Sequence, residues 1–374
     1  MRPFLLVAHR WVALAATLFI LIVAATGSAL VFEGAMDRAL YPNLWRVAPG
    51  TARLPLDTII ANARRAVPGP AAGITLATAP DRADVVQVGA NQVFVNPYTG
   101  ALLGTRSIAE WNATLPRRLH VLHVQLMTGR VGSEIVGAVT VIALLLVLTG
   151  IYLWWADKQW RINWSASWKR IVFDLHHTLG IAASVVLLAI TGSGVIMHYR
   201  TLNDAIAKLD RTAPPQIPDQ AAAPTGAEPL ALDSLERIAM AALPGARVMF
   251  ASMSPRATDP IAFALRFPED HTPGGRSRVF IDRYRGTVLL ATSTRTAPPG
   301  TRILNVMRSV HTGDVFGKPS EAVWLLASLV MLSQSVTGVM MWWNGRKGRA
   351  ARNRRAAIGG QLPAADAAPR VAVR

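Results

Sequence analysis

Four long apolar segments dominate the pattern of hydrophobic and polar positions along this 374-residue chain. They run over residues 11–32, 135–155, 171–197 and 322–343. Each has roughly the 20 apolar residues that an α-helix needs to cross a hydrocarbon core. The pattern therefore predicts four transmembrane helices. The first segment is too long for the core of a cleaved signal peptide, so we interpret it as a retained helix.

Two long polar segments, over residues 33–134 and 200–321, separate the apolar ones and have a common pattern. Amphipathic helices are predicted over residues 56–67 and 232–243, with Asp57 and Asp233 where an N-cap belongs. Each helix precedes a run that turns at a glycine, and such a run is typical of a β-hairpin. These hairpins are predicted over residues 94–103 and 280–289. A small α+β domain is expected in each polar segment.

One motif occurs twice, and it places a histidine 26 residues before a Thr-Gly pair. The first copy joins His123 to Thr149, Gly150, Trp154 and Trp155, and the second joins His311 to Thr337, Gly338, Trp342 and Trp343. His9 and His176 stand at the entrances of the first and third helices in the same way. We therefore predict two tandem helix–domain–helix repeats, related by an axis along the membrane normal. The Trp pairs are interpreted as anchors at the membrane interface.

The distribution of charged residues predicts how the helices are oriented in the membrane. Only 16% of the residues are charged, yet the formal net charge is +17. Basic residues gather at the N-terminus, between the second and third helices, and in the C-terminal tail, so these segments are predicted to be cytoplasmic and the polar domains outside. The excess charge is thus a topology signal with some attraction to anionic membrane lipid, and it does not indicate nucleic acid. The chain has no cysteine, which excludes disulfides, thiolate metal sites and covalently attached haem.

The order of helices and domains, together with short sequences, resembles the PepSY-associated transmembrane family. The sequences are HRW at 9–11, LHHTLG at 175–180, NPYTG at 96–100 and the two TGxxxWW helix ends. The resemblance covers residues 1 to about 346. It implies a bacterial inner-membrane protein linked to iron uptake, and some members of the family are ferric-siderophore reductases with b-type haem.

The predicted fold is therefore a membrane protein with four transmembrane α-helices and two small α+β PepSY-like domains on the outer side. Its expected parts are the first span (1–33), the first PepSY-like domain (34–118), the second span (119–156), a cytoplasmic linker (157–170), the third span (171–200), a linker with the second PepSY-like domain (201–300), the fourth span (301–344) and a basic, disordered cytoplasmic tail (345–374).

Histidine is costly inside a bilayer and marks a functional site there. A b-type haem in a helical bundle is held by two imidazoles from different helices. Pairing by depth predicts one haem on His9 and His176 near the cytoplasmic face, and another on His123 and His311 near the outer face. Three alternatives stay open as ligands: His198, His120 and His177. Solvation of interfacial histidines by water and headgroups is the competing interpretation.

Small residues accompany the histidines in the helices. They are Thr26, Gly27, Thr149, Gly150, Thr191, Gly192, Gly194, Thr337 and Gly338. They either let a flat porphyrin approach or serve helix–helix packing.

The paired histidines favour a di-haem b electron-transfer protein, and the resemblance implies that it reduces a periplasmic ferric siderophore and is hence an oxidoreductase. Electrons are expected from a cytoplasmic partner or from quinol, because the sequence has no Gly-rich nucleotide-binding loop. Four arginines around the second hairpin, Arg276, Arg278, Arg283 and Arg285, are candidates for binding an anionic ferric chelate or are solvated residues of an edge strand. The alternative function is a non-enzymatic membrane protein whose PepSY-like domains bind peptides or regulate a protease or a transporter.

Overall fold

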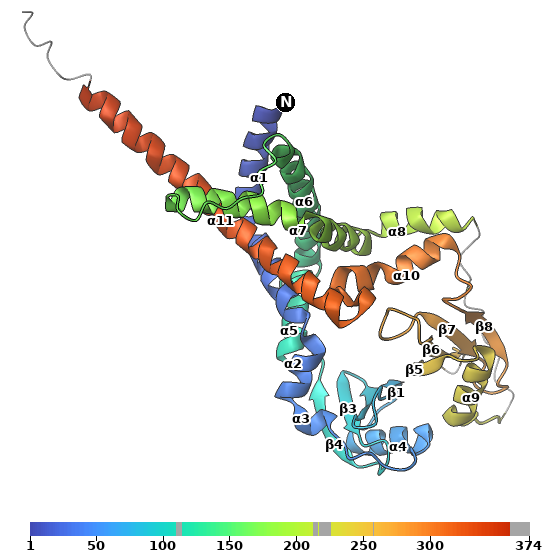
Figure 1. Ribbon diagram of the computed structural model, residues 1–374. Helices are drawn as coiled ribbons and strands as arrows, with labels where there is room; N and C mark the ends of the chain where they lie inside the picture. Colours follow the sequence, from blue (N-terminus) through green and yellow to red (C-terminus); the bar gives the residue numbers. More distant parts are fainter. Residues whose placement is uncertain (110–113, 212–215, 217–225, 257, 360–374) are drawn as a thin grey trace, which may run out of the picture.

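The computed structural model describes residues 1–109, 114–211, 216, 226–256 and 258–359, with side chains given up to Arg346. Four of its helices are long and apolar enough to cross a membrane. They are α1 (Arg2–Leu30), α6 (Arg130–Trp155), α7 (Trp168–His198) and α11 (Lys318–Gly359). The four apolar segments of the sequence fall on these helices. α1 and α7 each pack against both α6 and α11 (Figure 1). The chain is therefore a multi-pass membrane protein by the length and composition of its helices.

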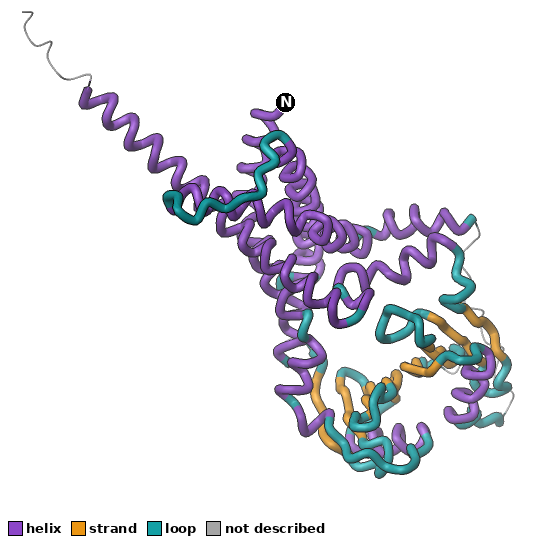
Figure 2. The backbone as a smooth tube through the Cα atoms, viewed as in Figure 1, coloured by secondary structure: helices purple, strands orange, loops and turns teal. Residues whose placement is uncertain are grey.

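Two shorter helices precede α6 and α11 and carry two of the candidate histidines. The regions predicted as single spans over 119–156 and 301–344 are each divided, into α5 (Leu115–Gln125) and α6, and into α10 (Pro299–Thr312) and α11. Left-handed backbone ends the first helix of each pair, with φ of 48° at Leu126 and 81° at Gly313. The break turns the chain, so α5 packs on α1 and α10 packs on α7 (Figure 2).

Eight strands form one antiparallel sheet beside the helices, in the order β4-β3-β2-β1-β5-β6-β7-β8. The strands are β1 (Ala71–Thr75), β2 (Asp84–Val88), β3 (Asn91–Val95), β4 (Leu102–Ser107), β5 (Arg247–Ser252), β6 (Ile261–Arg266), β7 (Ser277–Ile281) and β8 (Val288–Thr292). The predicted hairpins are β3–β4 and β7–β8. The two α+β units share one sheet, because β1 pairs with β5, as at Ile74 opposite Ala251.

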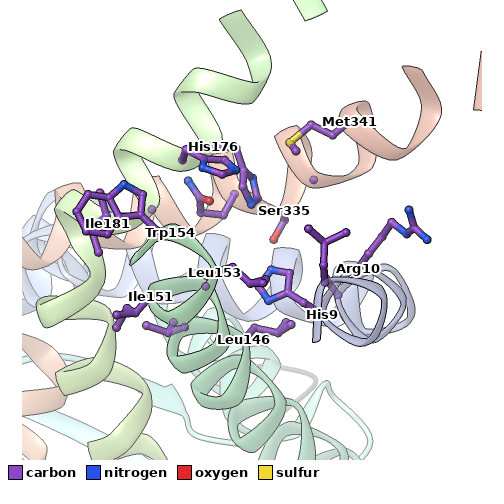
Figure 3. A pocket seen from close by; sticks show the side chains of 18 of the residues that line it. His9, Arg10, Leu146, Ile151, Leu153, Trp154, His176, Ile181, Ser335 and Met341 are labelled. Atoms are coloured by element: carbon purple, nitrogen blue, oxygen red, sulfur yellow. The ribbon is translucent and has the colours of Figure 1, made fainter. Parts of the chain in front are cut away.

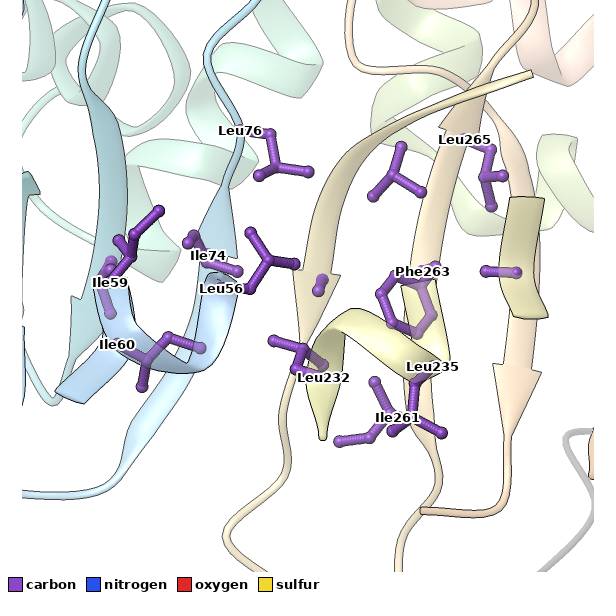
Figure 4. Close-up of a cluster of buried hydrophobic side chains, with 14 of the residues drawn as sticks. Leu56, Ile59, Ile60, Ile74, Leu76, Leu232, Leu235, Ile261, Phe263 and Leu265 are labelled. Carbon is purple, nitrogen blue, oxygen red and sulfur yellow. The ribbon is translucent and has the colours of Figure 1, made fainter. Parts of the chain in front are cut away.

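A single hydrophobic core lies beneath both predicted amphipathic helices, which are α4 (Leu56–Ala66) and α9 (Leu232–Ala242). Ile59 and Ile74 from the first unit and Leu235 and Phe263 from the second are almost fully buried in it (Figure 4). Burial of such a side chain contributes about 1.5–3 kcal/mol. The two units therefore stabilise each other through a common core.

The two predicted cap residues exchange partners. Sequence analysis placed Asp57 and Asp233 as caps of their own helices, and this is corrected by the structure. Asp57 accepts a hydrogen bond from the backbone N–H of Leu232 at 2.7 Å, and Asp233 accepts one from Leu56 at 2.9 Å. Burial raises the pKa of Asp57, and the nearby charge of Asp233 raises it further. Each carboxylate therefore caps the first residue of the other unit's helix and ties the two units together.

The exchanged caps give a first prediction. Asp57→Ala and Asp233→Ala are each expected to lower the free energy of unfolding of the sheet region by about 1 kcal/mol, the usual cost of losing a cap. Denaturant unfolding of the detergent-solubilised protein measures it, followed by fluorescence. Asp81→Ala is the control, because the Asp81 side chain is 56% exposed and pairs with its sequence neighbour Arg82. If the denaturant midpoint of unfolding is unchanged in both cap variants, these carboxylates do not stabilise the contact between the two α+β units.

Short helices complete the described chain. They are α2 (Glu33–Leu40), α3 (Pro42–Trp45), α8 (Arg200–Ala207), η2 (Lys208–Asp210) and η3 (Asp314–Phe316). Part of the linker predicted within residues 201–300 lies outside the described residues, which omit 212–215 and 217–225. The tail predicted to be disordered from residue 345 begins as a helix, because α11 continues to Gly359. Residues 360–374 lie outside the described residues.

Candidate functional site

Hydroxyl groups of two threonines fix the orientation of His9 and His176. His9 Nδ1 lies 2.8 Å from Thr149 Oγ1, and His176 Nδ1 lies 2.9 Å from Thr337 Oγ1. Each hydroxyl donates its own hydrogen to the carbonyl four residues earlier in its helix, at 2.7 and 2.6 Å. The hydroxyl oxygen must therefore accept from the imidazole, so that Nδ1 carries the hydrogen and Nε2 keeps the lone pair.

Backbone carbonyls impose the same tautomer on the other two candidate histidines. His123 Nδ1 donates to the carbonyl oxygen of Val23 at 3.0 Å, and His311 Nδ1 donates to that of Ile190 at 2.9 Å. A carbonyl oxygen can only accept, so these imidazoles also carry the hydrogen on Nδ1. A histidine held in this way offers Nε2 to a metal, with its tautomer and ring orientation set by the bond at Nδ1.

A hydroxyl residue followed by a glycine stands beside every one of the four imidazoles. We call these four pairs the hydroxyl–glycine sockets, and they are Thr26-Gly27 at His123, Thr149-Gly150 at His9, Ser193-Gly194 at His311 and Thr337-Gly338 at His176. A Cβ atom at Gly27 or Gly194 would come within 3.0 or 3.1 Å of the histidine Cε1. At Gly150 and Gly338 the corresponding distance is an ordinary 3.7 Å. The imidazoles of the His123/His311 pair thus need glycine for their position.

A cavity of about 450 Å³ contains His9 and His176. Figure 3 shows the two side chains entering it from α1 and α7. Its other lining is mostly apolar, with Leu146, Ile151 and Met341 among the residues drawn. Cofactor and ligand sites usually measure about 300–1,000 Å³ and have such a lining with a few polar groups. This cavity is therefore suited to a largely apolar group that contacts two imidazoles.

The His123 and His311 rings lie near each other, with centroids 6.2 Å apart and ring planes tilted by 54°. Two imidazoles that share one metal ion have centroids roughly 6 Å apart, since each metal–nitrogen bond is about 2.0 Å and the nitrogen lies about 1.1 Å from its ring centre. The observed spacing is therefore close to that of two imidazoles that ligate one metal ion, with one ring from α5 and the other from α10. No three His, Asp or Glu side chains among the described residues gather as the ligands of a bare metal ion would.

The two histidine pairs lie far apart along the helices. Thr26, which contacts His123, follows His9 by 17 residues on α1, and Ser193 follows His176 by the same number on α7. At a rise of about 1.5 Å per residue, 17 residues correspond to roughly 26 Å. That distance is close to the thickness of a hydrocarbon core.

The alternative ligands have other surroundings. His120 Nδ1 lies 3.9 Å from Glu33 and its side chain is 41% exposed. His198 packs against Gly137 and the ring of Tyr199. His177 stacks on Phe173 with ring centroids 4.1 Å apart, and it also lines the cavity of His9 and His176.

The four candidate arginines divide into two groups. Arg283 donates to the carbonyl oxygens of Asp259 and Ser254 at 2.7 and 3.1 Å, and Arg285 forms an ion pair with Asp282 at 3.1 Å. These two side chains hold the loops around β7 and β8.

The remaining two arginines are partly buried near α10. Burial lowers the pKa of Arg276, and so does the charge of Arg308, while burial and the charge of Arg276 lower the pKa of Arg278. Arg308 precedes His311 by three residues and therefore lies on the same side of α10. Sequence reasoning missed Arg308, although its spacing from His311 was a usable signal.

One comparison with known proteins is positive. A family model described as the PepSY-associated TM region matches residues 6–345. The match includes all four histidines, all four hydroxyl–glycine sockets and the whole sheet. No curated protein is significantly similar to this chain.

Proposed function

The chain belongs to the PepSY-associated TM family, and from this premise we propose that it is a di-haem b electron-transfer protein of a bacterial inner membrane. Its substrate is a ferric siderophore on the outer side, which makes it a haem-dependent reductase. One observation carries the proposal. Four imidazoles have Nδ1 held by a hydroxyl or a carbonyl and Nε2 available, and they form two pairs at different depths.

His9 and His176 would hold one haem, and His123 and His311 the other. A haem with two imidazole ligands supplies one-electron transfer and leaves no open position for oxygen. The protein keeps each imidazole in one tautomer and one orientation, and the first cavity has a mostly apolar lining. A separation of roughly 26 Å along α1 and α7 supports one site near each membrane face.

Charged side chains near the His123/His311 pair support a substrate site beside that pair. The charge of Arg308 lowers the pKa of Arg276, and the charge of Arg276 lowers the pKa of Arg278. Arg308 is one turn from His311 and also pairs with Asp314 at 3.8 Å. Such a basic cluster suits an anionic ferric chelate. Addition of one electron converts Fe(III) to Fe(II), which hard oxygen ligands bind more weakly, so the metal is released. The electron comes from a cytoplasmic partner or from quinol.

An absorption spectrum tests the proposal. Purified protein is expected to show sharp α-bands after dithionite, and to be reoxidised by a ferric siderophore with release of Fe(II) to a ferrous chelator. Arg276→Gln together with Arg308→Gln should slow this reoxidation about tenfold, because two charges that attract the chelate are lost. Arg161→Gln, in the cytoplasmic linker, is the control. A colourless protein after purification with haem supplied would refute the proposal.

Topology gives a separate prediction. Basic residues at the N-terminus, after α6 and after α11 place these segments in the cytoplasm by the positive-inside rule. A phosphatase fusion after Arg355 is expected to be inactive, and the same reporter inserted at Gly89, in the turn between β2 and β3, should be active. The reverse pattern would place the sheet in the cytoplasm and exclude a periplasmic substrate.

A second candidate function has one observation in its favour. A cleft of about 670 Å³ lies between the two α+β units, lined by Arg53 and Arg247 as well as by Asp233 and Glu236. Charges of both signs beside apolar side chains suit a peptide. Peptide binding by a protein that takes up no haem would favour this function, in which the helices serve as membrane anchors.

A further inference from the structure

Three buried polar atoms that lack a hydrogen-bond partner surround the cavity of His9 and His176. They are Arg10 Nε, His177 Nδ1 and Gln334 Nε2, and all three residues line that cavity. Arg10 and His177 directly follow His9 and His176, so they occupy equivalent places on α1 and α7. We call these three residues the donor rim. Figure 3 shows Arg10 beside His9 at the edge of the cavity.

The donor rim is costly without an occupant. A buried N–H that is left without an acceptor destabilises the protein, and more so when the group is charged. Arg10 lies within a candidate membrane span, where a cation is expensive unless it is paired. Among the described residues no carboxylate pairs with Arg10, whose guanidinium carbon lies 5.7 Å from the centre of the Trp11 ring. Arg2, on the same helix, has Asp157 at 2.7 Å.

The chemistry of the rim defines its missing partner. An arginine Nε and an amide nitrogen can only donate. The partner must therefore accept several hydrogen bonds and carry negative charge, and both properties belong to a carboxylate. It must also be attached to an apolar body, because the rest of the lining is mostly Leu, Ile, Val, Ala and Met.

We infer that the donor rim binds the carboxylates of the cavity's occupant. This inference rests on the proposed function, in which the occupant is haem b with its two propionates. The propionates then lie toward Arg10, His177 and Gln334, and the rim selects the orientation of the porphyrin between His9 and His176. The rim is thus a binding element that is separate from the two imidazoles.

Haem and its dimethyl ester provide the test, because esterification removes the negative charge and leaves the ring and the iron unchanged. Full-length apoprotein with His311→Ala, which keeps only the first pair complete, is titrated with each compound in detergent and followed by the Soret band. We expect it to bind haem at least about tenfold more tightly than the ester, as the loss of a charge-assisted hydrogen bond implies. Arg10→Met should reduce this preference to less than about threefold.

One further variant and a control make the result unambiguous. Gln334→Leu in the otherwise unchanged chain should weaken the preference for haem in part, and it tests the rim even where the double variant fails to fold. Arg161→Met removes an exposed arginine outside the cavity and should leave the preference unchanged. Equal affinity for haem and ester in the His311→Ala protein would overturn the inference while the proposed function stands. Absence of haem binding by the unaltered protein would overturn both.

Discussion

Replacement of either histidine of one pair by alanine is expected to halve the haem content. His9→Ala and His176→Ala should each leave one haem per chain, held by His123 and His311, and the reverse should hold for His123→Ala and His311→Ala. The reason is geometric. The pairs are separated by roughly 26 Å along α1 and α7, so loss of a ligand at one site leaves the contacts of the other intact. A pyridine haemochrome assay, normalised to protein, measures the ratio.

His198→Ala is the matched control for this experiment. His198 is also an intramembrane histidine at the end of α7, and it packs against Gly137 and Tyr199. The proposal requires two haems per chain in this variant. Two haems in all four ligand variants would show that the pairing is wrong, and His198 and His120 would then be the next ligands to test. If the unaltered protein contains one haem per chain, only one histidine pair binds haem. The four ligand variants then identify that pair.

The positions of the spans and of the hairpins could be predicted from the sequence because each depends on local pattern. A run of roughly 20 apolar residues is enough for a membrane helix, and a glycine turn between alternating segments is enough for a hairpin. The division of the predicted second span was missed, since Leu126 and Met127 adopt left-handed backbone that their side chains disfavour. Tertiary contacts of α5 with α1 override that local preference.

The contact between the two α+β units could not be predicted, because it depends on residues far apart in the chain. β1 pairs with β5 across more than 170 positions, and Asp57 caps the helix that begins at Leu232. Nothing in the neighbourhood of Asp57 distinguishes a cap for its own helix from a cap for another. The sequence indicated a capping role correctly and assigned the wrong helix.

The positions of the hydroxyl–glycine sockets could have been predicted from the sequence. Thr26 follows His9 by 17 residues, and the residue that follows His176 by 17 is Ser193 rather than Thr191. By residue type, Thr191-Gly192 is the closer match to Thr26-Gly27. In the structure, Ser193-Gly194 contacts His311, and this pair occupies the position on α7 that Thr26-Gly27 occupies on α1. Helical spacing decides which side chain meets His311, since a shift of two residues turns it about 200° around the axis.

The sockets lead to the second large prediction. Gly194→Val is expected to weaken haem binding at the His123/His311 site by about 10–100-fold, the usual effect of disturbing a group that orients a metal ligand. A Cβ atom at Gly194 would already lie 3.1 Å from His311 Cε1 and 3.1 Å from a methyl group of Thr140. The two extra methyl groups of valine come closer still. They push the imidazole away from the carbonyl of Ile190 that fixes its tautomer.

Graded controls lie on α7 and on α11, and they separate a local effect on the ligand from general damage to the helix bundle. Gly192→Val adds the same volume to α7 two residues earlier, where a Cβ atom meets nothing within 4 Å, so haem content should stay at two per chain. Gly338→Ala should also be tolerated, because its Cβ would lie 3.7 Å from His176 Cε1. Titration of each apoprotein with haem, followed by the Soret band, gives the affinities. If Gly192→Val and Gly194→Val lost haem equally, the glycines would serve helix packing alone, since only the second lies against an imidazole.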